Sequence, residues 1–229
     1  MKLTSVKDVF FDLDHTLWDF DKNSALTFKN IFNSNQIDID LKTFLTIYEP
    51  LNLNYWKLYR EDKIDKASLR YGRLFDTFKT LKISISDATI HKLSEDYISN
   101  LTSFNYLFES TVEILEYLSP NYNLHIITNG FKEVQHGKLS KSNIDHYFDT
   151  VTNSEMVGVK KPNPKIFNHA LEAAKANAEE SVMVGDNYEA DILGALNFGL
   201  DAICFNYHNE KLDNHIKSVN HLMELKKYL

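Results

Sequence analysis

The distribution of apolar positions changes twice along the chain. Residues 6–13 (VKDVFFDL) form a short and nearly continuous apolar run, which is typical of a buried strand. From about residue 19 to residue 104, apolar residues recur at helical spacing instead. We expect four successive helices there, enough for a small bundle. These helices are expected at 21–32, at 41–60 with Pro50 as a kink or break, at 65–81 and at 86–101.

Beyond about residue 105, strand-like and helix-like segments alternate. Such alternation predicts an α/β fold, a mostly parallel sheet with helices on both faces. The run at 6–13 belongs to the same sheet, so the helical stretch is an insertion after the first strand. We expect a core of 1–17 and 105–229, with a helical cap domain at 18–104. In the core, strands are expected at 123–130, 149–154, 181–187 and 201–205, and helices at 109–119, 131–143, 164–177 and 189–199.

Charge and cysteine content narrow the possible partners. The net charge of −7 argues against binding of a nucleic-acid polymer, since the chain has no surplus of cations to neutralise phosphates. It leaves room for a small phosphorylated ligand, which needs only one or two cations. Cys204 is the only cysteine, which excludes an internal disulfide and a thiolate metal cluster. No window approaches the roughly 18 apolar residues of a membrane span, so a cytoplasmic location without membrane contact is expected. The sequence predicts no oligomeric state.

Carboxylates follow the first buried strand directly. Asp12 and Asp14 end the apolar run, and a buried carboxylate without a partner is costly. Ligands of parallel sheets bind at the carboxyl ends of the strands. The strand at 181–187 also ends in an aspartate, Asp186, with Asp191 five residues further. We therefore expect these acidic side chains to meet in one crevice.

This crevice is expected to hold Mg²⁺, which prefers hard oxygen ligands and uses carboxylates together with phosphate and water. Asp12 and Asp186 are the predicted carboxylate ligands. Asp14 would point to the opposite face if the strand continued, so we expect the backbone to turn there and the Asp14 carbonyl to bind the metal.

A phosphoryl group fits the remaining space. We expect the side chain of Thr128 and the N–H groups of Asn129 and Gly130 to bind its oxygens, together with N–H groups of the loop after Asp12. Lys161, in the segment GVKKPNP, adds a point charge. Asp12 is the predicted nucleophile. Asp14 is expected to protonate the leaving group and then to accept a proton from the hydrolytic water.

The same residues resemble the four motifs of the haloacid dehalogenase (HAD) superfamily, in the right order along the core. These are Asp12-x-Asp14-x-Thr16, Thr128, Lys161 before Pro162, and Gly185-Asp186-x4-Asp191. The resemblance implies a Rossmann-like core, an inserted helical cap and a Mg²⁺-dependent aspartyl-phosphate mechanism. It favours Lys161 over Lys160 as the motif lysine.

The resemblance also implies roles for further residues. Thr16 is placed among the phosphate-binding residues. Asp191 is expected to orient Lys161 or the waters of the metal, and Asn187 to support the site beside it. The stretches DLDHTLWDFDKNSA and SEMVGVKKPNPKIF look like the branch that contains pyrimidine and non-canonical nucleoside 5′-monophosphate phosphatases.

The predicted function is therefore hydrolysis of a phosphomonoester, with a nucleoside 5′-monophosphate as the expected substrate. A phosphatase of phosphoglycolate or of a small sugar phosphate, and a phosphomutase, stay open. A dehalogenase is disfavoured because the resemblance places a second aspartate, Asp14, which that branch lacks. A phospho-receiver is disfavoured by the helical insertion after the first strand. With seven glycines the chain contains neither G-x-G-x-x-G nor a Walker A loop, which argues against a nucleotide-binding module of those kinds.

Overall fold

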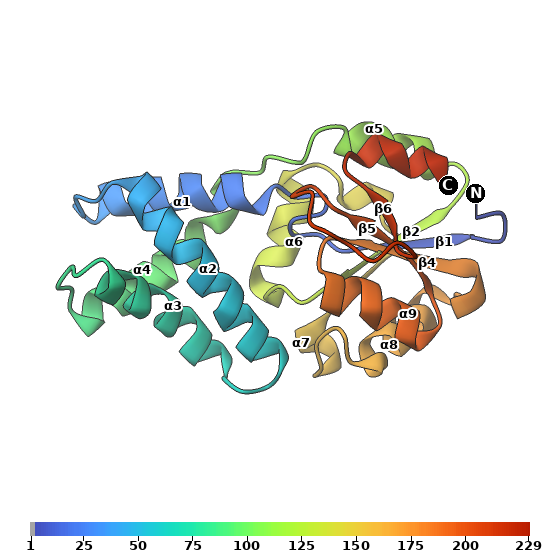
Figure 1. Ribbon diagram of the computed structural model, residues 1–229. Helices are drawn as coiled ribbons and strands as arrows, with labels where there is room; N and C mark the ends of the chain where they lie inside the picture. Colours follow the sequence, from blue (N-terminus) through green and yellow to red (C-terminus); the bar gives the residue numbers. More distant parts are fainter. Residues whose placement is uncertain (1–2) are drawn as a thin grey trace. The chain divides into compact units, whose positions relative to one another are not determined.

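The structure of the protein, a computed structural model, describes residues 3–229 (Figure 1). It contains two compact units, which we call the sheet unit and the helical unit. The sheet unit consists of residues 3–20 and Asn105–Leu229, and the helical unit of Asp21–Phe104. Trp18 belongs to the sheet unit, where it forms isolated β-bridges with Asp14 and Leu107. None of the described helices combines the length and the apolar character that a membrane crossing requires.

Six parallel strands form the sheet, in the order β3-β2-β1-β4-β5-β6. This confirms the predicted parallel sheet. The central strand β1 lies between β2 and β4, and its last residue, Phe11, pairs with Ile126 on one side and Val184 on the other. The register therefore brings the carboxyl ends of β1, β2 and β4 to one edge. The strands are β1 (Asp8–Phe11), β2 (Asn123–Thr128), β3 (Thr150–Asn153), β4 (Ser181–Gly185), β5 (Asp201–Phe205) and β6 (Lys217–Val219).

Helices cover both faces of this sheet. Figure 1 shows α5 and the C-terminal helix η5 on one face, and α8 and α9 on the other. Phe10, Ile127 and Met183 of the central strands pack with Phe167 of α8 in a fully buried apolar cluster. The α-helices are α5 (Thr111–Leu118), α6 (Lys132–Lys141), α7 (Ser154–Val157), α8 (Pro164–Ala174) and α9 (Gly194–Phe198). The 3₁₀-helices are η2 (Asp145–Tyr147), η3 (Ala178–Glu180) and η5 (Leu222–Lys227), and η4 (Tyr188–Leu193) is a π-helix.

The helical unit has an aromatic core. The ring of Phe28 lies 4.6 Å from the rings of both Tyr48 and Tyr97 and 4.8 Å from that of Phe44 (centroid distances). Pro50 was expected to kink or break this stretch; it lies inside one continuous helix, so no break occurs there. The helices are α1 (Phe20–Ser34), α2 (Leu41–Arg60), α3 (Lys66–Thr80), α4 (Asp87–Asn100) and the short η1 (Leu101–Ser103). Side chains of Asp40, Asp65 and Ser86 cap α2, α3 and α4 by accepting a backbone N–H.

Three features of the sheet unit differ from the sequence prediction. Strand β1 covers only Asp8–Phe11, because the chain turns directly after Asp12. The expected helix at 189–199 is divided into the π-helix η4 and α9. Strand β6 and helix η5 were not predicted, since three residues (KSV) carry too little periodicity to be recognised.

Candidate active site

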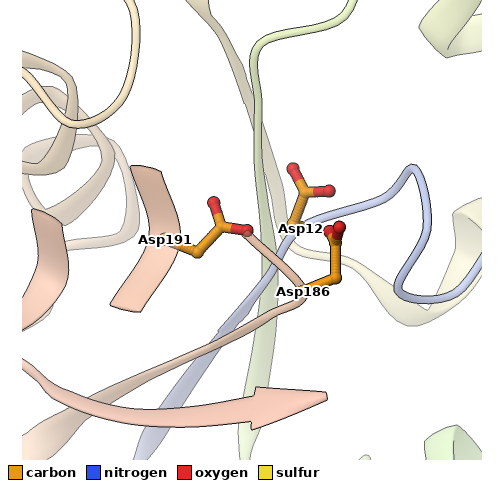
Figure 2. A group of neighbouring side chains, drawn as sticks. All are labelled: Asp12, Asp186 and Asp191. Atoms are coloured by element: carbon orange, nitrogen blue, oxygen red, sulfur yellow. The ribbon is translucent and has the colours of Figure 1, made fainter. Parts of the chain in front are cut away.

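Three buried or half-buried carboxylates meet where β1 and β4 end. Asp12 follows β1, Asp186 follows β4, and Asp191 lies on η4. One carboxylate oxygen from each lies within 4.8 Å of the others (Figure 2). The parallel pairing of β1 and β4 produces this approach, and the Asp12 N–H donates to the Val184 carbonyl at 2.8 Å. Gly185 leaves the necessary room, because a Cβ there would lie 2.3 Å from an oxygen of Asp191.

A buried ammonium group lies among these carboxylates. Lys161 is 1% exposed, and its Nζ lies 2.6 Å from Asp12 Oδ1 and 2.7 Å from Asp191 Oδ1. The same Nζ donates to the carbonyl of Ile127 on β2 at 2.6 Å. Lys161 thus contacts the acidic cluster directly, and the neighbouring Lys160 is half-buried.

The backbone of Lys161 is held by one side chain from the end of β2. Asn129 Oδ1 accepts the Lys161 N–H at 2.8 Å, and Asn129 Nδ2 donates to the Lys161 carbonyl at 3.0 Å. The Asn129 amide therefore pairs with both backbone groups of Lys161. The sequence predicts that the backbone N–H of Asn129 binds phosphate. The structure adds a second role, in which the Asn129 side chain holds the backbone of Lys161.

The side chain of Asp14 contacts two side chains of α6. Lys138 Nζ lies 2.5 Å from Asp14 Oδ1, and Gln135 Nε2 donates to Asp14 Oδ2 at 3.0 Å. The next residue, His15, has a φ of 62°, so the chain leaves the extended conformation at this point. The left-handed backbone makes the turn that the sequence predicts.

The remaining predicted phosphate-binding groups lie at the same edge and have partners within the protein. Thr128 Oγ1 accepts the N–H of Gly130 at 3.1 Å, and the Gly130 carbonyl accepts a hydrogen bond from Asn153. Thr16 is fully buried, and its hydroxyl donates to Asp186 Oδ1 at 3.3 Å. Thr16 thus contacts an acidic residue of the cluster, a partner that the sequence did not predict.

Asn187 supports the turn that carries Asp191. Its side-chain oxygen accepts the Ala190 N–H at 2.9 Å and caps η4. Its backbone N–H donates to Asp191 Oδ2 at 3.0 Å. Asp191 is therefore oriented by Asn187 on one oxygen and paired with Lys161 on the other.

Burial and mutual repulsion shape the electrostatics of the cluster. Burial raises the pKa of Asp12 from 3.8 to about 7; Lys161 lowers this pKa, while the charges of Asp191 and Asp14 raise it. Burial, then the charges of Asp191 and Asp12, raises the pKa of Asp186 well above its usual range. Burial lowers the pKa of Lys161, but the charges of Asp12 and Asp191 outweigh it, so that this pKa is raised. The single ammonium of Lys161 thus neutralises only part of the negative charge of Asp12, Asp186 and Asp191.

The donor set fits a divalent cation. Carboxylate oxygens are the hard ligands that Mg²⁺ prefers, and the cluster carries a surplus of negative charge over the single ammonium of Lys161. Mg²⁺ gives up its bound waters reluctantly, so it favours a site in which a few carboxylates leave the other coordination positions to water and phosphate. A cation here would offset the repulsion that raises the pKa values of Asp12 and Asp186.

This repulsion predicts how the stability of the metal-free protein depends on pH. The pKa of Asp12 is about 7 in the folded state and 3.8 without perturbation, so the folded state binds the proton more tightly. The contribution of Asp12 to the free energy of unfolding is then fully present below pH 3.8 and is lost as the pH rises through about 7. The loss amounts to at most about 4 kcal/mol. We expect Asp12→Asn, in chelator, to melt above the wild type at pH 8 by several degrees, with the difference shrinking at pH 5.

Melting curves at both pH values, with and without Mg²⁺, check this expectation. Mg²⁺ should raise the melting temperature of the wild type at pH 8 and leave that of Asp12→Asn nearly unchanged, because only the wild type keeps the full ligand set. A difference between the two proteins that does not change with pH would contradict the assigned cause.

Two residues of the site were not found from the sequence, Gln135 and Lys138. Both lie on α6 and both contact Asp14. The available signal was their i, i+3 spacing, which places them on one face of the helix that follows the Thr128 loop. Because both residues are polar and the apolar residues of this helix define no dominant face, the apolar pattern did not indicate that they point inward.

The comparisons with known proteins agree with this architecture. Residues 9–205 match the family of haloacid dehalogenase-like hydrolases. The chain is 33% identical over 226 residues to pyrimidine 5′-nucleotidase YjjG of Escherichia coli, covering 96% of each chain. It is 34% identical over 209 residues to a glyceraldehyde 3-phosphate phosphatase of Methanothermobacter thermautotrophicus, covering 88% of this chain and 86% of the relative. Among solved structures, YfnB of Bacillus subtilis, bound to magnesium, superposes with a TM-score of 0.87 at 25% identity, covering 97% of each chain.

The chain therefore belongs to the haloacid dehalogenase-like hydrolases. This confirms the resemblance on which the sequence interpretation relied.

Proposed function

We propose that the protein is a Mg²⁺-dependent phosphomonoester hydrolase that works through an aspartyl phosphate on Asp12. The observation that carries the proposal is the position of Asp12. It lies at the end of the central strand, with Lys161 Nζ 2.6 Å from one oxygen and the carboxylates of Asp186 and Asp191 close by. Lys161 lowers the pKa of Asp12 against the effect of burial and so favours the ionised form that a nucleophile requires.

Asp12, Asp186 and the backbone carbonyl of Asp14 would hold the metal ion. When bound, Mg²⁺ would polarise the phosphoryl group and offset the negative charge that gathers there. Lys161 contributes a second, permanent positive charge, since two carboxylates keep its ammonium protonated. Thr128 and the N–H groups of the Asn129–Gly130 turn would bind phosphoryl oxygens; the Gly130 N–H would exchange its contact with Thr128 for the ligand.

In the first half-reaction, an oxygen of Asp12 attacks phosphorus and the bond from phosphorus to the leaving oxygen breaks. The leaving oxygen takes a proton from the carboxyl group of Asp14. In the second half-reaction, water attacks phosphorus and gives a proton to Asp14, and the bond from phosphorus to Asp12 breaks. Phosphate leaves and both aspartates return to their starting forms. The two carboxylates can hold these separate roles because their surroundings differ, Asp12 beside Lys161 and Asp14 beside Lys138 and Gln135.

The proposed substrate is a nucleoside 5′-monophosphate. The support is the match to pyrimidine 5′-nucleotidase YjjG over 96% of both chains. A small sugar phosphate is the second candidate, because the glyceraldehyde 3-phosphate phosphatase is similar at 34% identity. We place the protein as a small-molecule phosphatase on the same grounds.

A phosphate-release screen tests both candidates. Purified protein with Mg²⁺ is offered pyrimidine and purine nucleoside 5′-monophosphates, glyceraldehyde 3-phosphate and phosphoglycolate. We expect kcat/KM for a pyrimidine 5′-monophosphate to exceed that for glyceraldehyde 3-phosphate by about tenfold or more, the result of about 1.4 kcal/mol of differential binding. The opposite order would select the second candidate. Phosphate release that requires a bisphosphate activator would indicate a phosphomutase.

A further inference from the structure

Lys138 is a buried lysine whose charge meets the side chain of Asp14. It is 1% exposed, and its Nζ lies 2.5 Å from Asp14 Oδ1, whose side chain is 18% exposed. A lysine is rarely buried without an ionic partner, and Asp14 is the partner here. Lys138 lies on α6 and Asp14 after β1, so the contact joins residues 124 positions apart.

Aromatic rings fix the ammonium of Lys138 from another side. Its Nζ lies 4.6 Å from the centroid of the Trp18 ring and 5.3 Å from that of Phe20. Trp18 is fully buried and bridges to Asp14 through the backbone. The lysine is thus enclosed by the same turn, residues 13–18, that carries Asp14.

Gln135 completes the enclosure, one turn of α6 before Lys138. Its Nε2 donates to Asp14 Oδ2 at 3.0 Å, so each carboxylate oxygen of Asp14 has a donor of its own. Gly130 provides the space for this contact. A Cβ at Gly130 would lie 1.4 Å from Gln135 Nε2 and 3.1 Å from Asp14 Oδ2.

From this geometry we infer that Lys138 and Gln135 are positioning residues for Asp14 and that α6 fixes the direction from which Asp14 meets the leaving oxygen. The inference rests on the proposed function, in which Asp14 transfers a proton and the bond from phosphorus to the leaving oxygen breaks. Neither Lys138 nor Gln135 needs to touch the phosphoryl group. Their effect is to hold the two oxygens of Asp14 in one orientation, and a misplacement of about 1 Å at a reacting group can cost about 100-fold in rate.

Leaving groups of different acidity separate this role from a merely structural one. An alkyl phosphate, such as a nucleoside 5′-monophosphate, releases a basic alkoxide that needs the proton from Asp14. p-Nitrophenyl phosphate releases a much more acidic phenol, which needs little protonation. Because kcat/KM includes steps only up to the first irreversible one, it reports the step in which the leaving group departs.

We expect Lys138→Met to lower kcat/KM for the best alkyl ester by about 100-fold and to change kcat/KM for p-nitrophenyl phosphate by less than about threefold. Asp14→Asn serves as the reference for this pattern. Lys141→Met, which changes an exposed lysine on the same helix, is the matched control and should leave both values unchanged. Gln135→Met should give the same selective loss at a smaller size, and it decides the question if Lys138→Met does not fold.

The possible results are distinct. If the wild type releases phosphate from neither ester, the proposed function fails. If the wild type is active and the folded variants lose activity equally on both esters, or lose none, the positioning role of Lys138 and Gln135 is overturned. Melting temperatures of all variants, measured alongside, establish that the compared proteins are folded.

Discussion

Asp12→Asn should reduce phosphate release by roughly 10⁴–10⁶-fold, the size of loss seen when a covalent nucleophile is removed. An amide keeps the shape of the side chain and can still accept a hydrogen bond from Lys161, but it cannot attack phosphorus. The loss should appear in kcat with every substrate, since the nucleophile serves them all. Steady-state phosphate release with the best ester from the screen measures it.

Asp8→Asn is the matched control for this variant. Asp8 is the first residue of β1, the strand that Asp12 follows, and it is 5% exposed. Its Oδ1 accepts a hydrogen bond from Asn123 Nδ2 at 2.9 Å and lies 3.2 Å from His125 Nε2. It is four residues from Asp12, about 13 Å along an extended strand. We expect Asp8→Asn to lower the melting temperature and to keep its activity per folded molecule. Full activity of Asp12→Asn would reject Asp12 as the nucleophile.

Lys161→Met should cost both stability and activity, while Lys160→Met should cost little of either. Removal of the Lys161 ammonium leaves Asp12 and Asp191 as unpaired buried carboxylates, and breaking a buried ion pair from one side costs about 3–5 kcal/mol. Loss of a positive charge that faces the transition state costs about 10²–10³-fold in kcat. Lys160 is only half-buried, and we expect its replacement to change stability by about 0.5 kcal/mol or less.

Urea unfolding and phosphate release on the two adjacent variants provide the measurement. The unfolding midpoint of Lys161→Met should recover as pH falls, because protonation of the carboxylates removes their repulsion. Equal losses in the two variants would show that the segment matters as a loop and that the ammonium of Lys161 has no particular role.

The parts of the fold that could be predicted are those with a local signal. The buried run before Asp12 and the alternating segments after residue 105 carry clear periodicity, and parallel strands must bring their carboxyl ends to one edge. The convergence of Asp12, Thr128 and Asp186, which lie at the ends of β1, β2 and β4, follows from that rule. Strand β6 could not be predicted in the same way, because its pairing with β5 stabilises a segment whose own sequence has little strand character.

The partners of the site residues were much harder to predict than the residues themselves. That Asn129 pairs with the backbone of Lys161, or that Thr16 donates to Asp186, depends on side-chain directions that a spacing does not contain. The contact of Lys138 with Asp14 depends on how α6 rotates about its axis, and the apolar residues of that helix do not define one dominant face. Long-range polar contacts were therefore missed even though the motifs were found.

The paired hydrogen bonds between Asn129 and Lys161 bear on how this enzyme family can diversify. The side-chain amide of Asn129, directly after β2, hydrogen-bonds both the N–H and the carbonyl of Lys161, as the backbone of a neighbouring strand would. The segment between β3 and α8 is thereby anchored at one point, whatever the length of chain on either side. We therefore expect the length of the chain before Lys160 to vary more freely than the identity of residue 129. A change of Asn129 would free the backbone of Lys161, while Asp12, Asp191 and the Ile127 carbonyl would still hold its ammonium.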